Sequence, residues 1–556
     1  INSNLSRSLI KFIFASTILI LIGYSTYILI FVRAGQYPNI NENNPDTMDR
    51  ALAYMNRDQY GDWEILNWSS TLARSENTNW RRYTANRSNP SFSDQMNFFF
   101  KYQINEMYLR YFSWQFMGRG DKEDHPWYIK DLNGNLVGNQ KLDGINIFRY
   151  GLPLAFILGI IGIFAHFKHD WRRALAVLSL FLATGLLIII YLNQYDPQPR
   201  ERDYSFVGSF FTFSIWIGIG LSSIQYRVKK FVENNNISLF ILISVISIVF
   251  IFMPIKMLAT DYFEHNRDRN FVAWDYGYNL LNSCEPNGII FTNGDNDTFP
   301  LWYLQEVENI RRDVKVVNLS LLNTPWYIDQ LMKQDPKLDF DFSNESFSND
   351  LYLIDPWYAT ESSFELCSKI FNEEPWNNLE CYLEVDGHIL EFNITPTLIG
   401  KLLRVQDYMI LKLIHDIGFE RPIYFAATVS NNNQLGLEKY LTMEGMTYRI
   451  SYTSNKDVAY GINYDKMKKN LTQSSSGKII YNPSDYENIL SSEDGVYRYT
   501  NLNDSSIFFN DNIERLVQNY RIGFIRLAQY DIERNNYNDA EKMIELMNKY
   551  FPPEIL

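Results

Sequence analysis

Two arginines alternate with two carboxylates in one short loop, and this pattern suits the binding of phosphate. Arg200, Glu201, Arg202 and Asp203 lie within Tyr195–Tyr204, where two prolines stiffen the chain. A guanidinium can donate two parallel hydrogen bonds to a phosphate or pyrophosphate. A neighbouring carboxylate could hold a divalent cation or orient a hydroxyl group. The alternative is a salt-bridged surface turn, and the residues alone leave both interpretations open.

A second acidic motif follows a strand expected at residues 288–292. One residue separates Asp295 from Asp297, as in the Asp-x-Asp motif with which some nucleotide-sugar transferases bind a metal. Two carboxylates at this spacing can share a hard cation with phosphate oxygens. However, Asp297 or Thr298 can equally cap the helix that is expected from Phe299. The sequence favours the cap or turn and leaves a metal as the alternative.

The histidines and cysteines exclude several familiar kinds of catalytic site. The histidines are scattered without a His-Glu-x-x-His pattern, and neither a phosphate-binding Gly-x-x-x-x-Gly-Lys loop nor a Gly-x-Ser-x-Gly elbow occurs. A zinc hydrolase or a P-loop ATPase is therefore a poor candidate. Cys367 and Cys381 could pair in an oxidising compartment and leave Cys284 over, or all three thiols could be unpaired.

Composition narrows the class of protein further. The 556 residues carry a net charge of −13 at pH 7, and nucleic-acid-binding proteins usually present a basic face instead. Nucleic acid is therefore not an expected partner. Three cysteines are too few for a disulfide framework or a four-cysteine zinc site. The mean hydropathy of −0.24 averages over a membrane half and a soluble half.

Five segments are long and apolar enough to cross a bilayer, which takes about 20 residues. They are Leu9–Val32, Ile147–Phe167, Ala174–Leu192, Phe206–Ile224 and Ile237–Met257. They lack internal charges and have basic ends, so buried core helices are a poor alternative. Residues 1–260 are therefore expected to form a membrane domain, with membrane lipids around its spans and an outer loop at 33–146. No such segment recurs beyond residue 260.

The basic residues between the spans predict an orientation. Clusters at Arg7–Lys11, Lys168–Arg173 and Arg227–Lys230 fall on one side if all five segments cross, and that side is cytoplasmic by the positive-inside rule. The outer side then receives the loop 33–146, the arginine-containing loop and everything after residue 260. Arg200 and Arg202 break the rule, which itself suggests a function for them.

An aromatic segment in the outer loop predicts one helix that is apolar over most of its girth. The prediction rests on ten aromatic or methionine residues in this segment: Phe98, Phe99, Phe100, Tyr102, Met107, Tyr108, Tyr111, Phe112, Trp114 and Phe116. One interpretation is an interfacial helix beside the entry of a lipid substrate, because Trp and Tyr suit the headgroup region. The other is a helix packed on the protein's own domain.

The soluble half alternates strand-like and helix-like segments, which predicts a parallel α/β sheet in residues 261–500. The expected strands are 288–292, 314–319 and 422–429, and the expected helices are 299–309, 326–333 and 402–417. Residues 501–556 predict a helical hairpin similar to one tetratricopeptide unit, with helices at 513–533 and from 538 onwards. A single such unit must pack on another surface to bury its apolar face.

Several stretches resemble one family of membrane proteins. The longest are Leu192–Phe210 and Phe291–Glu306, and the second continues at Val317–Thr324. Two further stretches, Asn43–Met48 and Tyr440–Arg449, are less similar. Together they resemble the domain-of-unknown-function 2723 family (DUF2723) of large inner-membrane proteins of Bacteroidetes and their relatives. The resemblance extends discontinuously over most of the chain.

That family is similar to the vertebrate transmembrane protein that O-mannosylates receptor ectodomains. The resemblance implies a GT-C-type transferase with many spans, a lipid-phosphate sugar donor and an acceptor on the non-cytoplasmic side. It also implies a bacterial inner membrane and a periplasmic C-terminal domain. The family's early spans, whose first outer loop carries an acidic pair, have no match here. The chain starts at Ile1 rather than methionine, so we expect an N-terminally truncated member without its catalytic base.

Two functions from different classes follow. The first is a membrane glycosyltransferase fragment that transfers a sugar from a polyprenyl-phosphate donor to a protein or glycan acceptor. Arg200 and Arg202 would then stabilise the leaving phosphate, alone or with a cation, and a carboxylate would deprotonate the acceptor hydroxyl. The second is a non-enzymatic, membrane-anchored assembly or interaction protein of the cell envelope. A transporter is a weaker third option, because the spans contain few charges for an ion relay.

Overall fold

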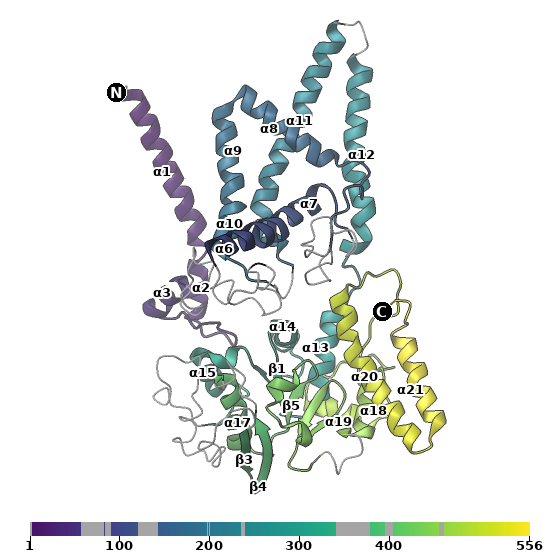
Figure 1. Ribbon diagram of the computed structural model, residues 1–556. Helices are drawn as coiled ribbons and strands as arrows, with labels where there is room; N and C mark the ends of the chain where they lie inside the picture. Colours follow the sequence, from purple (N-terminus) through teal and green to yellow (C-terminus); the bar gives the residue numbers. More distant parts are fainter. Residues whose placement is uncertain are drawn as a thin grey trace. The chain divides into compact units, whose positions relative to one another are not determined.

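The computed structural model describes residues 3–56, 83, 91–120, 143–196, 198, 201–234, 239–340, 379–394, 404–454 and 461–555. The chain forms two compact units (Figure 1). The helical unit is Tyr60–His265, and the sheet unit joins Ile1–Gln59 to Asn266–Leu556. The sheet unit thus contains both the first predicted span and the whole soluble half.

Three helical segments of the described residues are long and apolar enough to cross a membrane, which agrees with the expected membrane class. They are Ile10–Ala34, Trp171–Leu192 and Asp203–Val232. The first covers most of α1 (Ser3–Ser25) and all of α2 (Ile28–Ala34). The second contains α9 (Trp171–Ala183) and α10 (Leu186–Leu192). The third contains η4 (Asp203–Phe206) and most of α11 (Val207–Asn234). Each overlaps one predicted span.

The other two predicted spans are also helical, but their crossing stays a prediction. The helix α8 (Leu154–His169) has 16 residues and starts directly after Pro153, so the predicted residues 147–153 lie outside it. Proline favours the first turn of a helix and has no N–H to continue one from upstream. The helix α12 (Leu239–His265) has 27 residues and contains Pro254.

Small residues bring α8 and α11 into backbone contact. A Cβ atom placed on Gly162 of α8 would overlap the backbone of Trp216, and one placed on Gly220 of α11 would overlap the backbone of Leu158. Close packing over small residues is the usual device for joining helices in a membrane, where no hydrophobic effect drives them together. These two glycines therefore fix the framework of the helical unit.

We expect the Gly220→Ala substitution to destabilise the helical unit by about 1–3 kcal/mol, because the added methyl group must push the two backbones apart. Gly218 is the matched control, since it lies on the same helix with nothing within 4 Å of an added Cβ. Thermal unfolding in detergent should show a lower midpoint for Gly220→Ala and an unchanged one for Gly218→Ala. Equal midpoints for the two variants would rule out the contact.

The aromatic segment forms one continuous helix, which we call the outer-loop helix (Phe92–Phe116). It consists of α6 (Phe92–Phe98), the π-helix η2 (Phe99–Leu109) and α7 (Arg110–Phe116). Figure 1 shows it running crosswise to α9 and α11. Its buried residues share a core with Phe206, Phe213 and Trp216, so the helix packs on its own unit. Phe100, which is 58% exposed, lies outside that core.

The sheet unit is built on a mixed five-stranded sheet with the order β2-β1-β5-β7-β6. The strands are β1 (Ile289–Thr292), β2 (Lys315–Asn318), β5 (Ile423–Ala426), β6 (Leu441–Met443) and β7 (Thr447–Ile450). β1, β2 and β5 are parallel, as the alternating pattern predicts, whereas β7 pairs antiparallel with β5 and β6. A separate hairpin contains β3 (Leu379–Val385) and β4 (His388–Ile394).

Helices surround this sheet and share its core. They are α13 (Val272–Ser283), α14 (Asp295–Glu306), α15 (Pro325–Lys333), α17 (Val405–Ile417), α18 (Tyr464–Leu471) and α19 (Pro483–Ser491). α14 begins four residues before the predicted helix, because Asp295 and Asp297 already belong to its first turn. In the N-terminal part of the unit, α3 (Met48–Asn56) follows α2.

The C-terminal helices form the expected hairpin. α20 (Asp511–Glu533) and α21 (Tyr537–Tyr550) pack against each other. Phe524 and Leu527 of α20 are buried in the same core as the strands, and Asn279 of α13 donates a hydrogen bond to Tyr520 at 2.8 Å. The hairpin therefore buries its apolar face on the sheet unit. Its likeness to a tetratricopeptide unit stays a prediction.

Candidate functional site

The outer-loop helix holds the arginine loop (Asn193–Asp203) through a buried ion pair. Arg110 donates from its two terminal nitrogens to the two carboxylate oxygens of Glu201, at 3.0 and 2.7 Å. The Tyr111 hydroxyl donates to the same carboxylate at 2.5 Å and accepts from the backbone N–H of Arg202 at 3.1 Å. Arg110 is 2% exposed and stacks over Trp114. Both oxygens of Glu201 are engaged, so in this structure Glu201 positions the loop.

The electrostatics of this pair keep Glu201 ionised and Tyr111 protonated at neutral pH. Burial alone would raise the pKa of Glu201, but the Arg110 guanidinium and the Tyr111 hydroxyl bring it below the usual 4.5. Burial and the Glu201 carboxylate raise the pKa of Tyr111 well above its usual value. Such a pair is costly to break, because removing one partner leaves the other as an uncompensated buried charge.

Two more side chains of the π-helix fix the start of the loop. Tyr102 donates to the backbone oxygen of Tyr195 at 3.1 Å. Gln103 donates to the side chain of Asn193 and to the backbone oxygen of Gln194, both at 3.0 Å. A π-helical turn places side chains differently from an α-helix and often occurs at functional sites. The loop is therefore held from both ends by one helix.

The structure leaves Arg202 available for a ligand. Its Nε atom is buried, and no hydrogen-bond partner for it occurs among the described residues. The Oε1 atom of Gln103 is in the same situation. Asp203 begins η4 at the start of the span Asp203–Val232, whereas Arg200 lies outside the described residues. The part of the loop that the structure describes thus carries one guanidinium without an ion-pair partner, next to a span end.

The acidic motif after β1 lies in the sheet unit and separates its two carboxylates. Asp295 is exposed, whereas Asp297 is 8% exposed and accepts from the backbone N–H of Asn293 at 3.3 Å and from the Thr428 hydroxyl. Burial raises the pKa of Asp297 above its usual value, although these hydrogen bonds oppose the shift. Asp297 therefore joins the first turn of α14 to the segment after β5, through Thr428.

Neither acidic motif gathers a metal-binding group in the described part of the chain. No cluster of three or more His, Cys, Asp or Glu side chains occurs there that could hold a metal ion. Burial raises the pKa of Glu42 above its usual value, and the charge of Asp295 raises it further, so these two carboxylates lie near each other.

The structure describes the three cysteines only in part. Cys284 is a buried free thiol, whereas Cys367 and the side chain of Cys381 lie outside the description.

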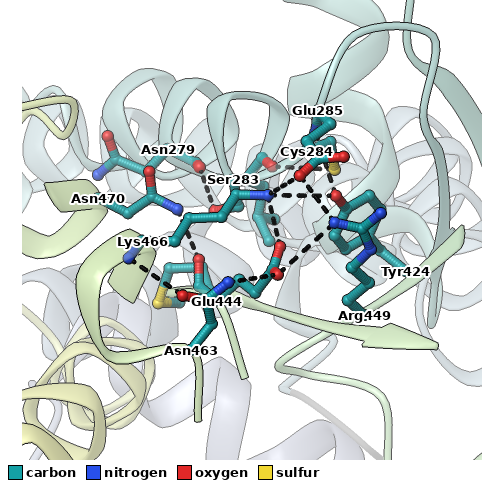
Figure 2. Close-up of polar contacts among 12 residues, drawn as sticks. Asn279, Ser283, Cys284, Glu285, Tyr424, Glu444, Arg449, Asn463, Lys466 and Asn470 are labelled. Carbon is teal, nitrogen blue, oxygen red and sulfur yellow. Dashed lines mark hydrogen bonds and ion pairs between the residues drawn. The ribbon is translucent and has the colours of Figure 1, made fainter. Parts of the chain in front are cut away.

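A charged cluster in the sheet unit was not expected from the sequence (Figure 2). The Lys466 ammonium lies between Glu285 at 2.9 Å and Glu444 at 2.5 Å. Arg449 also binds Glu285, at 2.7 Å. Glu444 is 2% exposed, and Lys466 donates to the Tyr424 hydroxyl at 3.4 Å. The cluster connects the end of α13, the β6–β7 hairpin and the start of α18.

The charges of this cluster balance within it. Two cations face two carboxylates, and the Lys466 ammonium has an acceptor for each of its three protons. Glu444 additionally accepts from Asn463 at 3.2 Å. A lysine so engaged has no free pair of electrons for proton abstraction, so the cluster suits positioning rather than catalysis. Two residues of the cluster, Glu444 and Arg449, lie in the stretch Tyr440–Arg449, which the sequence analysis singled out for its resemblance to a family.

A small cavity of about 50 Å³ contains a second buried lysine. Lys315 lines it together with Ile40, Trp302 and Gln330. Its ammonium donates to the backbone oxygen of Gln334 at 2.9 Å. Burial, assisted by the positive charge of Arg421, lowers the pKa of Lys315 to about 8. This amine is therefore much closer to neutrality than a surface lysine at physiological pH.

Comparison with known protein families gives a match in the sheet unit. Residues 273–355 and 384–471 match the family model described as TMEM260-associated domain 2. The matched residues include the charged cluster and Asp297, and they exclude the arginine loop. No curated protein matches the chain, and no solved structure matches it either.

Proposed function

We propose that this chain binds the phosphate of a polyprenyl-phosphate sugar donor at the arginine loop. In this proposal it takes part in transferring the sugar to a protein or glycan acceptor. The observation that carries the proposal is the outer-loop helix holding the loop in place while Arg202 keeps an uncommitted guanidinium. This guanidinium adjoins Asp203, where a candidate membrane span begins. The phosphate of a membrane-embedded lipid occupies the same depth as the end of a span.

The chemistry assigned to the loop is charge stabilisation. An acceptor hydroxyl forms a bond to the anomeric carbon of the sugar while the bond from that carbon to the phosphate oxygen breaks. The electron pair goes to the lipid phosphate, and Arg202, with Arg200, would stabilise the added charge. A carboxylate takes the hydroxyl proton. Glu201 is a poor choice for this base because Arg110 and Tyr111 occupy both of its oxygens.

The resemblance to the DUF2723 family extends this proposal. It supports a sugar as the transferred group, a base outside the described residues and an acceptor on the non-cytoplasmic side of a bacterial inner membrane. The sheet unit would then lie in the periplasm. A divalent cation could assist Arg202, although the described residues suggest no cluster to bind one.

The test is a donor-binding assay on the full chain in nanodiscs with a labelled polyprenyl-phosphate mannose. Arg202→Ala should weaken binding about 10- to 100-fold, because a charged hydrogen bond contributes about 1.5–3 kcal/mol. Arg200→Ala is measured beside it. The matched control is Arg227→Ala, which removes an exposed arginine near the other end of the same helix. Equal affinity of the Arg202 and Arg227 variants would place the donor phosphate elsewhere.

One observation favours the alternative, a non-enzymatic interaction protein of the cell envelope. α20 exposes three isoleucines, Ile522, Ile525 and Ile532, each more than 40% exposed. If the chain only recruits partners, replacing these isoleucines with serine should abolish its function in cells, whereas Arg202→Ala should leave that function intact. The reverse pattern supports the transferase.

A further inference from the structure

The outer face of α14 is apolar and exposed. Phe299, Tyr303 and Val307 follow one another at four-residue steps and are 46, 47 and 61% exposed. The opposite face of the same helix, with Leu301 and Leu304, is completely buried. Residues four apart share one side of a helix. The exposed residues therefore form a stripe, which we call the α14 stripe.

The same helix is attached to the end of the first candidate span. That span ends at Ala34, and only five residues further on the Asn39 side chain donates to Glu306 of α14 at 2.7 Å. Five residues reach about 17 Å when fully extended. The Asn41 side chain also donates back to the backbone oxygen of Ala34 at 3.3 Å. The C-terminal end of α14, where Glu306 lies, is therefore close to the end of the first candidate span.

Neighbouring contacts make this attachment firm. Gln330 of α15 donates to the backbone oxygen of Asn39 at 3.1 Å, and Gln334 donates to that of Pro38 at 3.0 Å. On either side of these anchor points, Tyr37 and Ile40 are 71 and 36% exposed. They add apolar surface to the same part of the sheet unit, which is directly connected to the span.

We propose that the α14 stripe docks into the headgroup region of the membrane that the first span crosses. Tyrosine and phenylalanine suit this region, where one end of the side chain is apolar and the other is wet. The surrounding charges select the kind of lipid. Asp295 precedes the stripe, Glu306 and Glu308 flank its end, and Arg312 offsets only Glu306. An acidic border fits neutral headgroups and repels anionic ones, so the docking is hydrophobic.

This docking does not depend on the proposed transferase activity. It follows from the connection between α14 and the span, and it holds equally for an interaction protein. Its consequence is mechanical, because the sheet unit becomes fixed to the membrane at two points, the span and the stripe. A sheet unit held at these two points keeps α14 against the lipid.

The experiment uses the full chain in phosphatidylcholine nanodiscs with a photo-crosslinking phenylalanine analogue at Tyr303. Tyr537, at the start of α21 and 61% exposed, is the matched control for an exposed tyrosine. After irradiation, mass spectrometry counts lipid adducts. We expect at least a fivefold higher lipid-adduct yield at Tyr303 than at Tyr537. Equal lipid-adduct yields at the two positions would overturn the proposal. Adducts at Tyr303 to protein alone would overturn it too, and they would identify a protein surface as the occupant.

A second arm tests the kind of lipid. The same Tyr303 variant is irradiated in nanodiscs that contain one third phosphatidylglycerol, at low and at high salt. We expect a lipid-adduct yield that does not exceed the yield in pure phosphatidylcholine and changes little with salt. A yield that rises severalfold with the anionic lipid and falls with salt would contradict the neutral interface.

Discussion

Replacing Arg110 with methionine should destabilise the helical unit by about 3–5 kcal/mol, the usual cost of breaking a buried ion pair. The arginine is 2% exposed and is the only cation that binds both oxygens of Glu201 among the described residues. Methionine fills much of the same volume, but it removes the hydrogen-bonded cation of Glu201 and also the ion-pair partner of the buried Glu106, which lies 3.4 Å from Arg110. Thermal unfolding in detergent, monitored together with limited proteolysis at the arginine loop, measures both stability and local order.

The control for this prediction is an exposed pair on the same stretch of chain. Arg119 binds Asp143, but its side chain is 51% exposed, so Arg119→Met should cost less than about 1 kcal/mol. The double variant Arg110→Met/Glu201→Leu should recover part of the loss, because it removes one of the two carboxylates that Arg110 pairs with and leaves only Glu106, which lies 3.4 Å from Arg110. Similar losses for the Arg110 and Arg119 variants, or a double variant as unstable as Arg110→Met, would show that the pair has no special role.

This pair shows which part of the candidate site the sequence could reveal. A single arginine inside the apolar run Phe98–Phe116 is a signal, since a charge on a buried helix face requires a partner. One partner, Glu106, lies four residues earlier on the same helix, but Glu201, which binds both terminal nitrogens, lies 91 residues away in the arginine loop, and no local pattern connects it to Arg110. The sequence separately indicated the aromatic helix and the loop. Their association arises from packing of the helical unit around Phe206 and Trp216.

The sheet shows the same division between local and non-local information. The strands β1, β2 and β5 could be predicted because each is a short apolar run next to a predicted helix, which follows β1 and β2 and precedes β5. The hairpin β6–β7 was missed, although Gly445 gives a local reason for it. Gly445 has a φ of 110°, and a Cβ there would overlap the Tyr497 hydroxyl. This backbone conformation is available to glycine and rarely to other residues.

The acidic motif illustrates why a short pattern leaves the chemistry open. Asp295 and Asp297 are equivalent in a three-residue pattern, but the first turn of α14 directs them to different surroundings. Asp297 turns inward to the Thr428 hydroxyl, 131 residues further along the chain, whereas Asp295 stays exposed. Asp297 lies in the first turn of α14, whose N-cap residue is Gly294, and accepts from the backbone N–H of Asn293. The contact with the loop after β5 required the folded sheet.

The second large effect is expected at the charged cluster. Lys466→Met should destabilise the sheet unit by about 3–5 kcal/mol, because Glu444 then has a buried carboxylate without its nearest cation. The matched control is Lys333→Met, which also breaks a lysine–carboxylate pair. In that pair the lysine side chain is 70% exposed and the aspartate 42%, so the cost should stay below about 1 kcal/mol. Comparable losses in the two variants would assign the cluster no more importance than a surface pair.

The pH dependence of this loss has a defined sign. Burial alone would raise the pKa of Glu285, but Lys466 and Arg449 bring it below its usual 4.5. A lowered pKa contributes stability that is present above pH 4.5 and is lost as the pH falls through the folded-state value. Lys466→Met removes one of the two cations, so less of this stability exists to be lost. Unfolding midpoints of wild type and Lys466→Met should therefore differ most near pH 7 and converge as the pH falls below 4.5, whereas a gap that widens with acid would contradict the role of Lys466 at Glu285.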